Sequence, residues 1–343
     1  MFFLSSWAQA ASFALFLTLA LPTDALPQPK RAKGKTTSAN SGATTDGATI
    51  AAATKITVAT DGSTIMDKTV TINGLSIRYK ISAPTDQFTT ASGVTGGAAA
   101  VNSTGTNGLN VLLHGDGGQS FIDFPNQAVQ DNLMGVVVLA PNSDRFWGGG
   151  SGLDRTDGVA HSSAVNSLIQ QQLAQDVAFD PTKVFFTGVS GGSIMLSGFF
   201  LPAFGATYQT GVVLACGALE PQVTVVDANT LVKSMKIHFQ TTSDELALLH
   251  TAIPAAVTAY EKLATDAGMS DADIGAVQTV DSTPDQGGHC GFDGVAFVSG
   301  VQLLSDGYSQ IISNGGNAKG VVTGINAATV LKVCLCYSTV ETC

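Results

Sequence analysis

Short apolar runs recur along the chain at the spacing of buried strands. The first two alternate apolar and polar residues within 69–81, on either side of Asn73-Gly74, and this dipeptide is a strong signal for a two-residue hairpin turn. Continuous apolar runs are typical of strands buried on both faces. Six such runs follow, at 109–113, 136–140, 184–187, 211–215, 236–239 and 276–280.

Helical periodicity separates several of these runs. Five apolar residues would share one face of a helix: Val165, Leu168, Ile169, Leu173 and Val177. Residues 253–267 and 294–312 form two further expected helices. Alternating strands and helices predict an α/β fold, with a mainly parallel twisted sheet, helices on both faces and the antiparallel N-terminal hairpin at one edge.

The N-terminal segment has the pattern of a secretory signal peptide. An apolar run at 10–21 precedes Pro22 and a small-residue ending at Ala25, and the run is too short to span a bilayer comfortably. We therefore expect a signal peptide at 1–25 and a secreted, extracellular protein. Residues 26–65 are expected to be a pro-region or disordered linker. Lys30-Arg31 within it is either a dibasic processing site or a solvated charge pair.

The remaining residues, 66–343, are expected to form the folded domain, with a cysteine-containing extension from about residue 316. Charged residues make up 12% of the chain and hydrophobic residues 44%, so a sizeable core can be buried. The net charge of −10 without a basic stripe argues against a nucleic-acid partner. We expect a monomer that does not contact membranes once the signal peptide is removed.

Cysteine usage and one sequon agree with secretion. Five cysteines permit two disulfides and leave one thiol. No histidine or second cysteine pair lies at zinc-like spacing, so structural disulfides are favoured over a metal site. Asn102 begins an N-glycosylation sequon, Asn102-Ser103-Thr104. The disulfide candidates are Cys216, Cys290, Cys334, Cys336 and Cys343.

The candidate chemistry begins at Gly188-Val189-Ser190-Gly191-Gly192, between the run 184–187 and a helix-like stretch. A strand that turns sharply into a helix holds its central residue in strained backbone geometry, and only small neighbours fit beside it. Gly188 and Gly192 occupy the positions where crowding would be greatest. The pattern predicts that Ser190 is a nucleophile.

A base and an acid follow at the ends of later strands. Asp244 comes shortly after the run 236–239, and His289 lies in the glycine-rich loop after 276–280. Because catalytic groups gather at the carboxyl ends of parallel strands, Ser190, His289 and Asp244 form a candidate triad. Asp281 and Asp285 are alternative acids. The other histidines are expected elsewhere: His238 in the core, His161 at a helix start and His250 on a helix.

The order of these residues, with the turn at Ser190, resembles the α/β-hydrolase fold. His114-Gly115-Asp116-Gly117-Gly118 is similar to the His-Gly oxyanion loop of its esterases and lipases. Residues 179–192 resemble secreted polyhydroxybutyrate depolymerases, feruloyl esterases and acetylxylan esterases, and the likeness extends over roughly 70–312. The resemblance implies a triad that needs no metal or cofactor, with an oxyanion hole formed by the backbone N–H groups of Gly191 and Asp116.

Further candidate roles concern a disulfide near the site and two side chains that could contact substrate. Tannase-like feruloyl esterases bridge cysteines that adjoin the serine and the histidine, but here Val189 precedes Ser190 while Cys290 follows His289. If Cys290 is bridged, Cys216 is the preferred partner, with the three C-terminal cysteines also available. His114 and Trp147 are substrate-binding candidates. His114 more often orders its own loop, and Trp147 either stacks on substrate or pins the loop 142–158.

These features predict a secreted serine carboxylic ester hydrolase that acts through an acyl-enzyme. The expected substrates are small or polymer-linked esters, namely acetyl or feruloyl groups on polysaccharide, or a polyhydroxyalkanoate. Two alternatives stay open: a serine peptidase on the same fold, and a catalytically silent secreted binding protein. Turnover of matched ester and amide substrates distinguishes the peptidase from the esterase. Covalent labelling by a fluorophosphonate distinguishes the silent binding protein from both enzymes.

Overall fold

The computed structural model describes residues 54–59, 61–123, 129–282 and 286–306, and three short strands at 312–313, 317–318 and 329–330. All of them belong to one compact unit, Ile50–Cys343. The expected signal peptide, Lys30-Arg31 and three cysteines lie outside the described residues: Cys334, Cys336 and Cys343.

The N-terminal hairpin forms as the sequence predicts. Strands β2 (Thr64–Ile72) and β3 (Leu75–Ala83) pair antiparallel, and Asn73 and Gly74 both have positive φ, 51° and 80°, as this turn requires. A further strand, β1 (Lys55–Val58), pairs with β2. The folded part therefore begins within the range predicted as linker, 26–65. The strand β1 lies at the edge of the sheet and is exposed throughout, so it has no burial pattern to reveal it.

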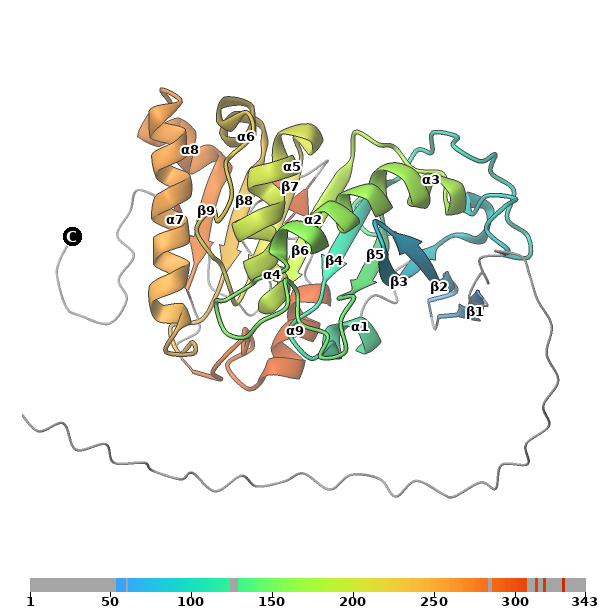
Figure 1. Ribbon diagram of the computed structural model, residues 1–343, viewed down its shortest axis with the longest axis horizontal. Coiled ribbons are helices and arrows are strands. Elements are labelled where there is room, and N and C mark those ends of the chain that lie inside the picture. Colours follow the sequence, from blue (N-terminus) through green and yellow to red (C-terminus); the bar gives the residue numbers. More distant parts are fainter. Residues whose placement is uncertain are drawn as a thin grey trace, which may run out of the picture. The chain divides into compact units, whose positions relative to one another are not determined.

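Six strands form the parallel body of the sheet, which has the α/β-hydrolase fold (Figure 1). The order of the ten strands is β1-β2-β3-β5-β4-β6-β7-β8-β9-β12, and the pairs from β5 to β9 are all parallel. The predicted runs match these strands closely, except that 276–277 close a helix and the last parallel strand begins at Gln278. The parallel strands are β4 (Gly108–Leu113), β5 (Leu133–Leu139), β6 (Val184–Val189), β7 (Gly211–Ala215), β8 (Lys236–Gln240) and β9 (Gln278–Asp281).

Short strands complete the described C-terminal part. Strand β12 (Thr329–Val330) pairs antiparallel with β9, while β10 (Ile312–Ser313) and β11 (Asn317–Ala318) pair with each other.

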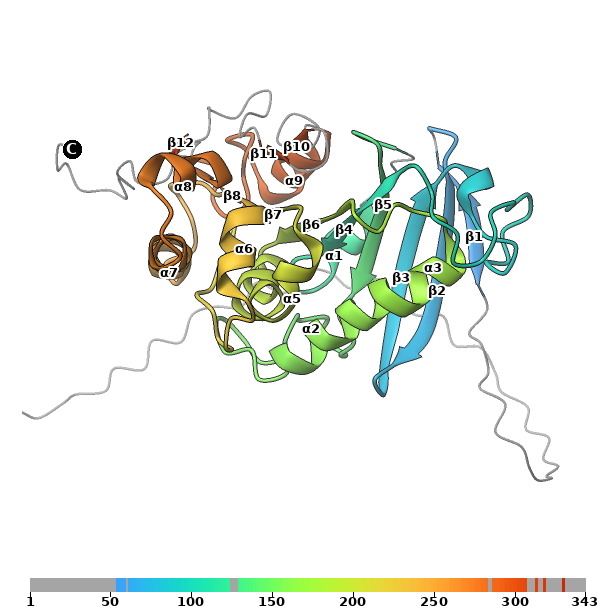
Figure 2. The same ribbon diagram turned by 90° about the horizontal axis from the view of Figure 1, so that it is seen from above.

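Helices cover both faces of the sheet (Figure 2). The larger apolar core lies under α2 (Gly158–Ser167), η2 (Leu168–Gln172), α3 (Leu173–Asp176), α5 (Leu201–Tyr208), α6 (Ala228–Ser234) and α7 (Leu249–Asp266). The smaller core lies under α1 (Gln119–Asp123) and α9 (Phe297–Asp306), and α8 (Asp271–Val277) packs against α6 and α7. Two segments follow the turn at Ser190, α4 (Gly191–Met195) and η3 (Leu196–Phe200), and η1 (Thr85–Gln87) follows β3. Within the described part of the chain, no helix is long and apolar enough to cross a bilayer.

A buried carboxylate joins the hairpin to the larger helical layer. Asp176, at the end of α3, accepts hydrogen bonds from Lys68 Nζ at 2.7 Å, from Gln172 Nε2 at 3.0 Å and from the Tyr79 hydroxyl. The Asp176 side chain is 1% exposed and that of Lys68 19%. Burial, and then the Asp176 charge, raise the pKa of Tyr79, so its hydroxyl stays a donor.

Asp176→Ala is expected to lower the free energy of unfolding by about 3 to 5 kcal/mol, because it leaves a partly buried ammonium group and a buried hydroxyl without their acceptor. Urea unfolding checks this. Asp266→Ala is the matched control and should change stability little, because its ion pair with Lys262 is exposed. Equal effects of the two variants would contradict the role given to Asp176.

Candidate active site

Ser190 lies on a sharp turn between β6 and α4. Its backbone has φ 51° and ψ −114°, in the left-handed range that residues with side chains seldom adopt. Its N–H donates to the carbonyl of Ala215, at the end of the neighbouring strand β7, at 2.8 Å. This is the strained strand-to-helix geometry that the sequence predicts for Ser190.

The glycines beside Ser190 are required by close packing. A Cβ added to Gly188 would lie 2.6 Å from the backbone nitrogen of Ser193, and one added to Gly192 would lie 2.1 Å from the carbonyl oxygen of Leu113. Both distances are shorter than real Cβ contacts. The expectation that Gly188 and Gly192 occupy crowded positions is confirmed, and both contacts are with backbone atoms.

His289 connects the serine to a carboxylate. Its Nε2 is 2.9 Å from Ser190 Oγ, and its Nδ1 is 2.5 Å from Glu245 Oε2. An ionised carboxylate can only accept, so Nδ1 carries the proton and the Nε2 lone pair faces the serine hydroxyl. This arrangement can withdraw a proton from Ser190 as it attacks.

The carboxylate is Glu245, so the choice of Asp244 was wrong. The Asp244 side chain is exposed, whereas that of Glu245 is fully buried. Glu245 Oε1 also lies within 3.2 Å of Thr241 Oγ1 and 3.4 Å of Thr242 Oγ1, which orients the carboxylate. Neighbouring residues of the loop after β8 point in different directions, and the sequence signal for this acid was only a pair of adjacent carboxylates.

The other candidate acids and bases occupy other elements where the structure describes them. Asp281 ends β9, and Asp285 lies outside the described residues. His238 is buried in β8 between Thr279 and Gln240, and burial lowers its pKa to about 4, as expected for a core histidine. His161 lies within α2, where its Nδ1 accepts from the Gly148 N–H at 2.8 Å.

A disulfide anchors the histidine loop. Cys290, next to His289, is bonded to Cys216, which directly follows β7. This confirms the preferred pairing. A bridge between residues separated by 74 positions stabilises the fold by roughly 4 kcal/mol in the chain-entropy account. Because both sulfurs are bonded to each other, their closeness to His289 does not make a set of metal ligands.

The loop after β4 approaches Ser190 from the other side. A Cβ on Gly115 would be 3.4 Å from that of Ser190. His114 is buried, and burial lowers its pKa to about 4. Its Nε2 accepts from the Ala140 N–H at 2.9 Å, so its Nδ1 donates to the Gly115 carbonyl at 2.6 Å. His114 therefore orders this loop and is not placed to bind substrate.

Asp116 in this loop is held by a buried arginine. Arg155 donates to both Asp116 carboxylate oxygens, at 2.9 and 2.7 Å, and to the carbonyls of Trp147 and Gly152. The Arg155 side chain is 1% exposed. A Cβ on Gly191 would lie 2.0 Å from Asp116 Oδ1, so the two predicted oxyanion donors belong to segments in direct contact. Arg155 lies in the loop 142–158, and sequence reasoning missed this ion pair.

Trp147 does not face the site. It is fully buried, with its ring centroid 5.5 Å from that of His114 and 6.1 Å from that of His161. The substrate-binding prediction for Trp147 is therefore wrong, and the residue packs inside the loop that it was alternatively expected to pin. An aromatic residue that sequence reasoning missed lies at the site: Phe297, at the start of α9, is 5.9 Å from the His289 ring centroid.

Comparisons with known proteins give structural likeness only. No protein-family model and no curated protein matches the chain. Solved structures that align with it include a zinc-bound cold-adapted esterase from an Arctic intertidal metagenomic library, at 14% identity and TM-score 0.41, covering 72% of this chain and 95% of that one. Acetyl xylan esterase from Aspergillus awamori aligns at 14% identity and TM-score 0.37, over 60% and 81% of the two chains.

A thermophilic esterase from the Planctomycetes species Thermogutta terrifontis, with propionate bound, aligns at 12% identity and TM-score 0.43, over 71% and 93%. Likeness at this level leaves the function to be argued from the site.

Glu245→Gln is expected to slow covalent modification of Ser190 by a fluorophosphonate on the order of 10³-fold, because an amide at this position favours the wrong tautomer of His289. Mass spectrometry of the labelled protein over time measures the rate. The same chemical change one residue earlier, Asp244→Asn, should leave the rate unaltered, since that side chain is exposed. Greater slowing by Asp244→Asn would restore Asp244 as the acid.

Proposed function

We propose that the protein is a serine carboxylic ester hydrolase that acts through an acyl-enzyme, with Ser190, His289 and Glu245 as its triad. One observation carries the proposal: Ser190, on a strained strand-to-helix turn, lies 2.9 Å from an imidazole nitrogen whose other nitrogen lies 2.5 Å from a buried carboxylate. This combination supplies a nucleophile, a base and the group that orients the base.

In the first half of the reaction, Ser190 Oγ attacks the ester carbonyl and its proton passes to His289 Nε2. The tetrahedral intermediate then expels the alcohol, which takes that proton from His289 as the acyl group stays on Ser190. In the second half, a water gives its proton to His289 and attacks the acyl-enzyme, and the carboxylic acid leaves as Ser190 regains its proton. Glu245 stabilises the imidazolium in both halves.

The oxyanion is held by the backbone N–H groups of Gly191 and Asp116. Gly191 is the first residue of α4, where backbone N–H groups have no acceptor within the helix. In the loop after β4, the N–H of Gly117 donates to the Arg145 carbonyl and that of Gly118 to the Gly115 carbonyl. Both of those amides are therefore engaged, which favours Asp116 as the donor from this loop.

Phe297 beside the imidazole, with exposed apolar residues in the loops that carry Glu245 and His289, supports an ester with an apolar acyl group. Phe297 is half-buried beside His289. Leu246 and Leu248, after Glu245, are 47% and 42% exposed, and Val295 and Val298, after His289, are 73% and 59% exposed. The substrate classes expected from sequence, feruloyl or acetyl esters of polysaccharide and polyhydroxyalkanoates, stay part of the proposal.

Secretion is proposed on the signal-peptide pattern at 1–25 and is supported by the disulfide, since disulfides persist in oxidising compartments. Asn102 is exposed and accepts from Gln175 Nε2 at 2.7 Å, and its glycosylation stays a prediction. So do the monomeric state and the independence from metals and cofactors.

Ser190→Ala is expected to reduce hydrolysis of a short p-nitrophenyl ester on the order of 10⁴- to 10⁶-fold, because no other group replaces the nucleophile. Steady-state kinetics on the purified protein measure it. Ser193→Ala is the matched control and should retain most activity, because the Ser193 hydroxyl donates to the Ala215 carbonyl. Full hydrolysis by Ser190→Ala would refute the esterase, and faster turnover of a matched amide would favour the peptidase.

Arg155→Lys is expected to lower kcat about tenfold to a hundredfold with KM changed less than about twofold, because the bidentate contact that positions Asp116 acts on the transition state. Lys183→Ala, which removes the partly exposed ion pair with Asp180, is the control and should leave both constants as they are. A rise in KM at constant kcat would show instead that Arg155 serves ground-state binding.

A further inference from the structure

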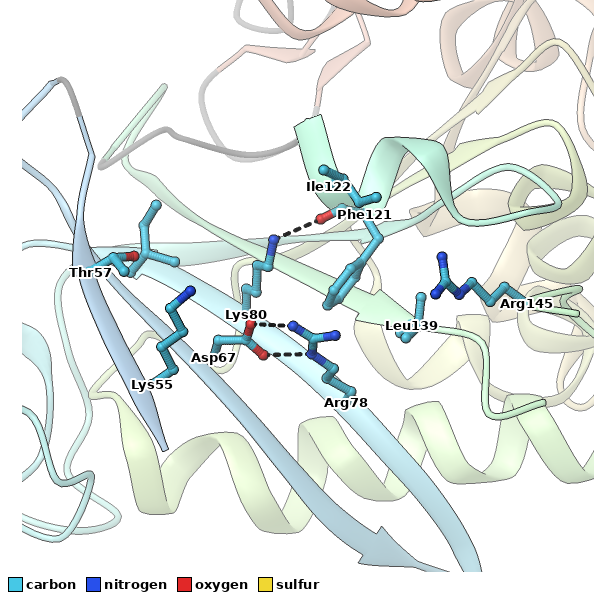
Figure 3. A pocket seen from close by; sticks show the side chains of 10 residues that line it. Lys55, Thr57, Asp67, Arg78, Lys80, Phe121, Ile122, Leu139 and Arg145 are labelled. Carbon is cyan, nitrogen blue, oxygen red and sulfur yellow. Dashed lines mark hydrogen bonds and ion pairs between the residues drawn. The ribbon is translucent and has the colours of Figure 1, made fainter. Parts of the chain in front are cut away.

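A cavity of about 420 Å³ lies against the N-terminal strands (Figure 3). Among the residues that the structure describes, four basic side chains and one acidic side chain line it: Lys55, Arg78, Lys80, Arg145 and Asp67. These five side chains together carry a formal charge of +3, although the chain as a whole carries −10. Such a local reversal of sign marks a place where anions gather.

Strand alternation places these charges on one side of the sheet. Met66, Ile77 and Tyr79 face the larger core. Successive side chains of a strand point to opposite faces, so Asp67 and Arg78, which directly adjoin these residues, face the other side. Strand pairing then aligns Lys55 of β1 with Asp67 of β2, and Asp67 with Lys80 of β3. The two lysines come from different strands and stand on either side of one carboxylate.

That carboxylate is already engaged by the arginine. Arg78 donates from Nε and Nη2 to the two Asp67 oxygens at 2.9 and 2.6 Å. Phe121, on α1, contacts two of the cations. Its ring centroid is 4.6 Å from Lys80 Nζ and 5.2 Å from Arg78 Cζ. Lys80 also donates to the Phe121 carbonyl at 3.0 Å. Like charges that lie close together repel one another, and an anion bound between them relieves this repulsion.

Basic residues are not spread evenly over the described part of the chain. Four of its ten lysines and arginines line this cavity. Most of the others are held in ion pairs with acidic partners outside it. These other six are Lys68, Arg155, Lys183, Lys233, Lys236 and Lys262.

The cavity adjoins the active site through one loop. Gly115, at one end of that loop, approaches Ser190, and a Cβ on Gly118, at the other end, would lie 2.7 Å from Arg145 Cδ. The helix α1, which follows immediately, supplies Phe121. The loop after β4 therefore leads from Ser190 toward the cavity.

We propose that this cavity is a subsite for carboxylate groups on the polysaccharide part of the ester substrate, that is, for an oligosaccharide that carries uronate residues. The inference rests on the proposed function. It assigns the polysaccharide, which is the alcohol part of the ester, to this cavity and the apolar acyl group to the site beside Phe297. A concave site does not fit a flat membrane surface, and the negative charge of the rest of the protein opposes a dense polyanion such as nucleic acid. An oligosaccharide with spaced carboxylates meets both conditions.

Calorimetric titration of the full-length protein at low ionic strength tests the subsite, with tetragalacturonate as the probe and neutral xylotetraose as its uncharged counterpart. We expect binding of the charged tetramer alone. Lys55→Gln should weaken it about three- to fivefold, the effect of one exposed ion pair. Asp67→Asn should strengthen it by a similar factor, because it removes a negative charge from the cavity and releases Arg78 from its ion pair. Thermal unfolding verifies that both variants are folded.

Lys233→Gln is the matched control, since Lys233 is exposed on α6, outside this cavity, and should leave affinity as in the wild type. Equal binding of the neutral tetramer, an equal loss in Lys233→Gln, or weaker binding in Asp67→Asn would overturn the proposal. Affinity for monomeric galacturonate equal to that for the tetramer would overturn its polymeric part. The probe carries no ester, so these outcomes are independent of the Ser190→Ala result, which tests the proposed function alone.

Discussion

The left-handed backbone of Ser190 is stabilised by close packing against segments from the two neighbouring strands. Gly192 lies against the carbonyl of Leu113, the last residue of β4, and a Cβ on Gly217, after β7, would be 2.7 Å from the Ser190 carbonyl oxygen. Both contacts come from strands that are direct neighbours of β6 in the sheet. The strand order therefore fixes which segments pack against the turn. His289, Glu245 and the loop after β4 are all placed relative to this turn.

Buried charges link parts of the chain that are far apart in sequence. Arg155 ties the loop after β5 to the loop after β4, and Asp176 ties the end of α3 to the hairpin. A buried charge without its partner is costly, so each pair is satisfied in one relative placement of its segments. In a chain with only 12% charged residues, these few contacts supply specificity that apolar packing alone does not.

Local sequence patterns were sufficient for the sheet, the hairpin turn at Asn73 and the pair Ser190 and His289. Buried parallel strands are continuous apolar runs, and the turn at the serine tolerates only glycine at its crowded positions. The patterns do not separate Asp244 from Glu245, since both are carboxylates in one loop and only tertiary packing turns one inward. Trp147 presents the same difficulty, because a loop aromatic can face a cleft or the interior without any change in sequence.

The strand β1 forms an open edge of the described sheet. An edge strand presents unpaired backbone groups that another chain can extend into a larger sheet. Here the edge is only four residues long, fully exposed and begins with Lys55. Its ammonium group makes the approach of a second such edge unfavourable by like-charge repulsion. The same lysine that lines the cationic cavity therefore also disfavours edge-to-edge pairing at β1.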